Sequence, residues 1–264
     1  MRRWFSVAFA LIACAIVAMF ALRSALTRPF QAPAGPPPAG AKPIHFASDS
    51  GAEIRGWWWD ARDAKGVVLL LPGVRANRRS MVDRATFLHA AGYTTMLVDF
   101  QATGESRGKA ITFGDRERHD VLGAVAFARK QAPHAKLAII GSSLGGAATL
   151  LATPPLDVDA MVLEAVYPSI DRAVENRLAI RMGRTLAKIA SPLLLAQVDE
   201  DALRPIDHIA GKKHVDLHRA VTREYEERVL RFLQTSTVSA TASVANKPIA
   251  ALKTSSTEMS SMQR

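Results

Sequence analysis

The sequence predicts an α/β protein: a mostly parallel sheet flanked by helices. Two observations predict this class, namely near-continuous apolar segments that suit buried strands and helical segments that alternate with them. The predicted strands are Ile54–Trp59, Gly66–Leu71, Thr94–Asp99, Lys136–Gly141 and Ala160–Val166. The predicted helices are Arg79–Ala91, Asp115–Gln131, Ser143–Ala152 and Thr222–Leu233. In an open sheet of this kind, functional sites form at the carboxyl ends of the strands.

Composition narrows the class of protein. The chain has 264 residues, 48% hydrophobic and 22% charged, which excludes collagen-like, wholly disordered and multi-pass membrane proteins. Its net charge of +10 is spread along the chain without a Lys/Arg block, so we expect no nucleic-acid partner. Cys14 is the only cysteine, and Cys/His spacings typical of structural zinc are absent from the sequence. We therefore expect neither a metal nor a cofactor.

The first 27 residues are predicted to be a membrane anchor or signal. From Trp4 to Leu22 the only polar residue is Ser6. As a helix this stretch is ~28 Å long, close to the ~30 Å hydrocarbon core of a bilayer. Because Arg23 interrupts the positions where a signal peptidase would cut, an uncleaved transmembrane helix is favoured.

Two other signals compete with the uncleaved anchor. The sequence before Cys14 resembles a bacterial lipoprotein signal, in which Cys14 would be lipidated, and Arg2-Arg3 faintly resembles a twin-arginine signal. A slight excess of positive charge before the apolar segment predicts that the body lies outside the cytoplasm, on the periplasmic side of a bacterial inner membrane.

The remaining chain divides into three parts. Residues 28–43 form a Pro/Ala/Gly linker that we expect to be extended and unpacked. Residues 44–234 form the folded domain, in which about 168–210 are cap-like helices. Residues 235–264 hold 12 Ser/Thr and no sustained periodicity, which predicts a disordered tail.

Ser143 is the strongest candidate for chemistry. Gly141-Ser142-Ser143-Leu144-Gly145 follows an apolar strand and precedes an apolar helix, which is the context that a G-x-S-x-G nucleophile elbow requires. A sharp turn needs small neighbours, hence the two glycines, and it projects the Ser143 hydroxyl above the sheet. The same residues would also suit a plain tight turn or a phosphate-binding loop. We predict that Ser143 is a nucleophile.

A serine nucleophile needs a base that takes its proton. In this topology the base is expected late in the chain, at the end of the last strand. His214 lies in a predicted loop just before the helix Thr222–Leu233, so we expect His214 to be the base, with His218 as the nearby alternative.

The sequence resembles the α/β-hydrolase superfamily, in particular the serine aminopeptidase and monoacylglycerol lipase-like group of membrane-anchored bacterial hydrolases. The resemblance rests on four segments and covers roughly 54–233: Leu71-Pro72-Gly73-Val74, the stretch from Asp99 to Ser106, Gly141 to Gly145, and His214-Val215-Asp216-Leu217.

This resemblance implies that Ser143 is the nucleophile and His214 the general base. It also implies that the backbone N–H groups of Val74 and Leu144 form the oxyanion hole. The chain departs from the family pattern at Pro72 and Thr103, where relatives usually carry histidine. We interpret the stretch around Thr103 as a structural turn.

The acid of the triad has two interpretations. In the first, Pro192–Val198 is a strand and Asp201 (or Asp199) is the acid, but only 12 residues separate Asp201 from His214, too few for a crossover helix and a strand. In the second, Pro192–Gln197 belongs to a cap helix, and a segment holding the acid and two C-terminal strands is missing from this chain. The second fits better, and Asp201 remains the candidate acid.

Together these observations predict a membrane-tethered serine hydrolase that acts through an acyl-enzyme at Ser143, with esters as the favoured substrates and amides as the second choice. A small-molecule or lipid-like acyl substrate fits the membrane address. The alternative is a catalytically impaired binding protein, or degenerate family member, with the same fold.

Overall fold

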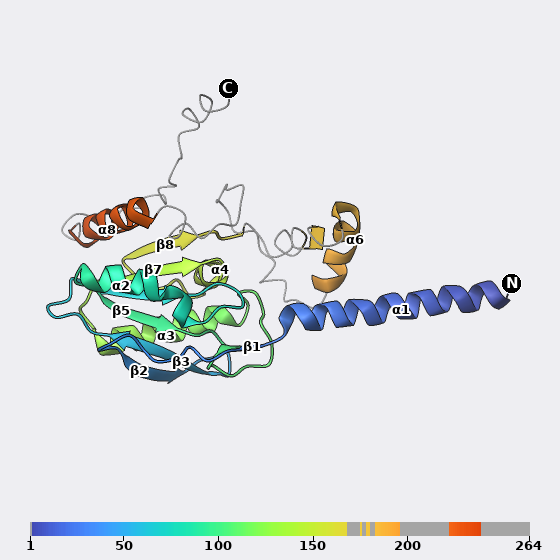
Figure 1. The fold of residues 1–264 in the computed structure, drawn as a ribbon, viewed down its shortest axis with the longest axis horizontal. Coiled ribbons are helices and arrows are strands. Elements are labelled where there is room, and N and C mark those ends of the chain that lie inside the picture. The colour runs from blue at the N-terminus through green and yellow to red at the C-terminus, as the bar shows by residue number, and fades with distance from the viewer. Residues whose placement is uncertain (1, 168–174, 176–177, 180–182, 196–221, 239–264) are drawn as a thin grey trace, which may run out of the picture.

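A six-stranded sheet forms the centre of the protein (Figure 1). The computed structural model describes residues 2–167, 175, 178–179, 183–195 and 222–238. The strand order is β2-β3-β5-β4-β7-β8, with the four strands β5, β4, β7 and β8 parallel and β2 and β3 antiparallel to their neighbours. The bounds are β2 Lys42–Ala47, β3 Glu53–Trp59, β4 Val67–Leu71, β5 Thr94–Val98, β7 Leu137–Ser142 and β8 Ala160–Glu164. The mostly parallel sheet predicted from the sequence is confirmed.

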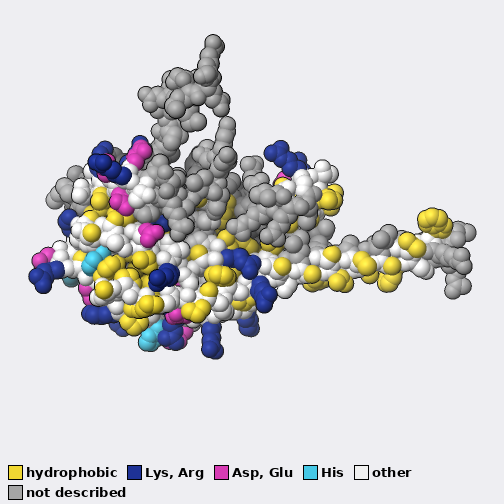
Figure 2. Space-filling model, viewed as in Figure 1, with side chains coloured by type: hydrophobic (Ala, Val, Ile, Leu, Met, Phe, Trp, Pro, Cys, Tyr) yellow, Lys and Arg dark blue, Asp and Glu magenta, His cyan; other side chains and the backbone are white. Residues whose placement is uncertain are grey.

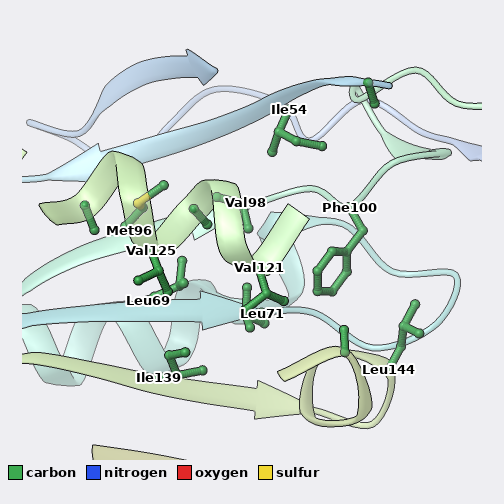
Figure 3. Packing of buried hydrophobic residues seen from close by; sticks show 14 of the residues in the cluster. Ile54, Leu69, Leu71, Met96, Val98, Phe100, Val121, Val125, Ile139 and Leu144 are labelled. Atoms are coloured by element: carbon green, nitrogen blue, oxygen red, sulfur yellow. The ribbon is translucent and has the colours of Figure 1, made fainter. Parts of the chain in front are cut away.

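Helices cover both faces of the sheet. On one face α3 (Glu117–Gln131) and α4 (Leu144–Leu151) contribute to one hydrophobic core, part of which is drawn in Figure 3. On the other face α2 (Val82–Ala90), which follows the 3₁₀ turn Arg78–Met81, and α8 (Thr222–Val238) contribute to a second core. Every residue of β4 and β5 is buried, as expected of parallel strands covered on both sides.

The prediction of an unpacked linker over 28–43 is wrong at both ends: Lys42 and Pro43 belong to β2, and the first half of the segment packs on the domain. Phe30–Gln31 forms β1, which pairs in parallel with β6 (Thr103–Gly104). Ala34 is fully buried, and its N–H donates to Glu105 Oε1 at 3.2 Å. Asn77 Nδ2 donates to the Ala32 carbonyl at 3.1 Å. The Pro/Ala/Gly segment packs because side chains from the domain satisfy its backbone groups.

The first residues form one helix, α1 (Arg2–Thr27), which extends away from the body (Figure 1). Within the described part of the chain, no helix combines the length and the hydropathy needed to cross a bilayer. The helix is therefore present, but the structure does not support the transmembrane part of the fold prediction.

The C-terminal part of the domain corrects two further expectations. Helix α6 spans Arg184–Leu195 and contains Pro192. The interpretation of Pro192–Val198 as a strand is therefore wrong for Pro192–Leu195, and these residues are helical, as the second interpretation predicted. Helix α8 continues to Val238, so the first four residues of the predicted disordered tail are helical, whereas 239–264 lie outside the described residues. In the described residues, β8 is the last strand of the chain.

Candidate active site

Ser143 lies at a sharp corner between β7 and α4. Its backbone has φ 51° and ψ −105°, a conformation that residues other than glycine rarely adopt and that costs of order 1–3 kcal/mol. Two hydrogen bonds hold the corner: Ser143 N–H donates to the Glu164 carbonyl at 2.8 Å, and Ala147 N–H donates to the Ser143 carbonyl at 3.0 Å. The corner therefore has the geometry that a nucleophile elbow requires.

The glycines around Ser143 leave no room for a side chain. A Cβ on Gly145 would lie 2.5 Å from the Leu71 carbonyl oxygen at the end of β4. A Cβ on Gly141 would lie 2.7 Å from the nitrogen of Gly146. Real Cβ atoms essentially never come this close, so the turn can form only with glycine at both positions, as the sequence predicts.

The segment after β4 runs beside the corner. The Pro72 carbonyl accepts a hydrogen bond from Gly145 N–H at 3.1 Å, and a Cβ on Gly73 would lie 3.6 Å from Ser143 Cβ. Val74 is the next residue and packs partly against the first core. Leu144 is the first residue of α4. The backbone N–H groups of the first helical turn have no acceptor within the helix, and the helix dipole places partial positive charge there. Both candidate oxyanion donors thus belong to segments that adjoin Ser143.

The candidate base and acid are not placed. His214, its alternative His218, Asp201 and Asp199 all fall within 196–221, outside the described residues. Their roles therefore stay predictions from the sequence and the family resemblance.

Glu164, at the end of β8, is a site residue that the sequence interpretation missed. Its side chain is 2% exposed, and its carboxylate accepts hydrogen bonds from Arg84 Nε at 3.0 Å, from Arg84 Nη2 and from the Tyr225 hydroxyl. Burial, and then the adjacent Glu164 charge, raise the pKa of the Tyr225 hydroxyl above its usual value. In the sequence, Glu164 is marked only as an acidic residue at the end of an apolar strand.

Asp99, at the end of β5, has a structural environment. It is fully buried, and its carboxylate accepts from the N–H of Arg78 at 2.6 Å, from the N–H of Glu105 at 2.9 Å and from the Arg78 guanidinium. Arg78 also lies over the ring of Trp57 and donates to Glu105, whose pKa is lowered mainly by that hydrogen bond. These contacts fasten the turn after β5 to the helix layer.

Two buried acids sit in the first turn of α3. Asp120 accepts hydrogen bonds from Ser48 Oγ at 2.6 Å and from Gln101 N–H at 2.8 Å, and burial raises the pKa of its carboxyl to about 7. Glu117 accepts from Gln101 Nε2 at 2.8 Å and from Gly114 N–H at 2.8 Å. Among the described residues, no group of three or more His, Cys, Asp or Glu could hold a metal ion.

Comparison with known proteins decides the family. Residues 62–245, more than half of the chain, match the sequence profile described as serine aminopeptidase, S33. The chain belongs to the serine aminopeptidase S33 family. This membership, with the α/β-hydrolase fold, supports a hydrolase.

This S33 family member is similar to several known proteins. Polyketide transferase ATR5 from Stachybotrys chlorohalonatus is 27% identical over 182 residues, and the match covers 64% of this chain but only 61% of that relative. The Pyrococcus furiosus esterase Pf2001 shares the fold with a TM-score of 0.63 at 19% identity, covering 80% of this chain and 98% of that one. The α/β hydrolase GrgF from Penicillium sp. sh18 has a TM-score of 0.56 at 17% identity, covering 75% and 99%.

Proposed function

We propose that this S33 family member is a serine hydrolase that cleaves esters through an acyl-enzyme at Ser143. The observation that carries the proposal is the corner itself: a non-glycine residue with φ 51° between β7 and α4, confined by two glycines. Strain of this kind persists only where the surrounding structure enforces it, and it clusters at functional sites. Here it places a hydroxyl-bearing residue at the N-terminus of a helix.

The proposed reaction has two halves. A base, for which His214 is the candidate, takes the Ser143 proton as Oγ attacks the ester carbonyl carbon. The oxygen of the tetrahedral intermediate gains negative charge, and the N–H groups of Leu144 and Val74 would stabilise it. The intermediate collapses, the alcohol leaves with the proton, and the acyl group stays on Oγ. Water then attacks the acyl-enzyme by the same route and releases the carboxylic acid.

The proposal also includes a preference for esters and attachment to the membrane. The Pyrococcus furiosus relative is named as an esterase, and the exposed apolar residues of α1 favour a lipid-like acyl substrate. Tethering through α1, with the body in the periplasm, is tested by fractionation: the full chain should sediment with inner membranes and be released by detergent but not by alkaline carbonate. A wholly soluble full-length chain would contradict the tether.

A second candidate function is a binding protein with an impaired triad. The observation that favours it is the 12-residue interval between Asp201 and His214. Loss of the acid in a serine hydrolase costs on the order of 10⁴ in turnover, while the remaining groups still exceed the uncatalysed rate.

A fluorophosphonate probe distinguishes the two candidates, because it reacts only with an activated serine. The detergent-solubilised chain should be labelled, and Ser143→Ala should abolish the labelling. Ser142→Ala is the matched control, since it removes the neighbouring hydroxyl and should keep the labelling. Absence of labelling in a folded wild-type protein would favour the binding protein.

A further inference from the structure

The body end of α1 is fastened to the carboxyl-end loops of the sheet. The Thr27 carbonyl accepts a hydrogen bond from Ile111 N–H at 2.8 Å, and Arg75 Nη1 donates to the Ala25 carbonyl at 3.1 Å. A few residues on, Gln31 Nε2 donates to the Ser106 carbonyl at 3.2 Å. The loop from 105 to 111 and the residue after Val74 therefore flank the point where α1 leaves the body.

These segments carry four exposed cations, which we call the basic collar: Arg28, which follows α1 directly, Arg75, and Arg107 and Lys109 of the loop. None of them has an ion-pair partner among the residues that the structure describes. The acid closest in sequence, Glu105, already binds Arg78 and the Ala34 N–H. Figure 2 shows Lys and Arg side chains gathered on the body near the place where α1 joins it. Within the described part of the chain, the collar is thus a positive surface whose charges are not paired with acids.

Beyond the collar, α1 exposes large apolar side chains. Trp4 is 80% exposed and Phe9 75% exposed, and Val17 and Phe20 are also exposed. Helix α6 contacts α1 and exposes Leu186 and Ile189. Along α1 toward the body, exposed apolar side chains are followed by the cations of the collar. This is the order in which the hydrocarbon core and the anionic headgroups follow each other at a membrane surface. Charge and apolar surface therefore indicate the same partner.

We propose that the basic collar binds the anionic headgroups of a phospholipid bilayer and thereby holds the carboxyl ends of the strands toward the membrane. The arrowheads of β7 and β8 point to the side of the molecule where α1 and α6 lie (Figure 1). Arg75 is two residues from Gly73, whose backbone adjoins Ser143. An ester that leaves the bilayer would then first meet the carboxyl ends of the strands, where Ser143 lies. This inference rests on the membrane part of the proposed function and is independent of the serine chemistry.

Energy transfer from tryptophan to a dansyl-labelled phospholipid measures how close the body lies to the membrane. In a Trp4→Phe background, the remaining tryptophans are Trp57, Trp58 and Trp59, all in β3 of the body. The full chain is reconstituted into vesicles of phosphatidylcholine alone or of phosphatidylcholine mixed with phosphatidylglycerol. We expect greater transfer in the anionic vesicles, and we expect ~1 M salt, where the screening length is ~3 Å, to remove the difference.

The collar is tested by charge removal with a matched control. The double variant Arg107→Gln/Lys109→Gln should lose most of the difference in energy transfer between anionic and neutral vesicles. The control is Arg62→Gln/Lys130→Gln, which removes the same charge from two exposed residues. Arg62 precedes β4 and Lys130 lies in the last turn of α3, at the amino ends of the parallel strands. This variant should keep the difference in energy transfer between anionic and neutral vesicles. Equal energy transfer in the two vesicle types would contradict headgroup binding by the collar, and so would an equal loss of the difference in both double variants. Either result could be obtained with α1 still bound to the vesicles. Failure of the full chain to bind vesicles would overturn the tether as well, and fluorophosphonate labelling would be unaffected.

Discussion

The backbone N–H of Ser143 donates a hydrogen bond to the carbonyl of Glu164 at 2.8 Å, where the parallel strands β7 and β8 end side by side. The carboxylate of the same Glu164 is held by Arg84 of α2 and Tyr225 of α8. One residue therefore connects the backbone of the candidate nucleophile to both helices on the second face of the sheet. Displacement of Glu164 should move the Ser143 corner as well as weaken the fold.

Glu164→Ala should destabilise the protein severely, because it removes the buried carboxylate that binds the Arg84 guanidinium and the Tyr225 hydroxyl. Breaking a buried ion pair in this way typically costs ~3–5 kcal/mol. Urea unfolding followed by circular dichroism measures the loss. Glu227→Ala is the control: its partner Arg223 is exposed one helical turn away, and such pairs contribute ~0.3–0.5 kcal/mol. Equal losses in the two variants would show that the Glu164 pair has no special structural weight.

Gly145→Ala should remove fluorophosphonate labelling and lower stability. The new Cβ would meet the Leu71 carbonyl oxygen at 2.5 Å, so β4 or the corner must move. Overpacking of this kind costs ~1–3 kcal/mol. Gly123→Ala, within α3, is the control. The atoms nearest to its Cβ would be those of the Phe46 ring and the Ala47 carbonyl oxygen, at 3.2–3.5 Å, and helix propensity favours alanine by ~1 kcal/mol. A labelled, stable Gly145→Ala protein would mean that the corner tolerates a wider turn than its geometry implies.

The parts of the fold that the sequence predicts are those whose signal is local. Strands β4 and β5 are buried on both faces, so their apolar residues are continuous in the chain. The Ser143 corner is also local, because the glycines that permit it lie two residues away on either side. In contrast, β2 is an edge strand with no buried residue, so its sequence has no continuous apolar segment that would predict a strand.

What the sequence could not show depends on partners far along the chain. Ala34 is buried against Glu105, 71 residues away, so a Pro/Ala/Gly segment that looks like a free linker is packed. Glu164 meets Arg84 and Tyr225 at separations of 80 and 61 residues. No periodicity or motif records such pairings, because each side chain alone is ordinary in its own element.

Ala34→Asp should release the first half of the linker segment. Ala34 is fully buried, and an aspartate there would place a charge in the second core, next to Glu105. We expect faster cleavage within residues 29–41 by a nonspecific protease, read by mass spectrometry of the fragments. Ala39→Asp introduces the same charge at an exposed position of the same segment and should cleave at the wild-type rate. If both variants cleave alike, the segment is not held by the packing of Ala34.

Asp120 makes stability depend on pH. Burial raises the pKa of its carboxyl from 3.8 to about 7, against the opposing hydrogen bonds from Ser48 and Gln101 and with a further rise from the neighbouring Glu117. The folded protein therefore keeps a proton that the unfolded chain releases above pH 4. The contribution of Asp120 to the free energy of unfolding is fully present below about pH 4 and is lost as pH rises to about 7.

Asp120→Asn should remove that loss, because an amide stays neutral at every pH and still offers an oxygen to the Gln101 N–H. Urea unfolding from pH 4 to pH 8 should show wild type losing stability relative to the variant as pH rises, by up to ~4 kcal/mol for a pKa shift of about three units. Ser48→Ala removes a hydrogen bond that lowers the pKa, so its stability should keep falling to a higher pH than in wild type. Parallel pH profiles for wild type and Asp120→Asn would show that Asp120 is already ionised in the folded protein.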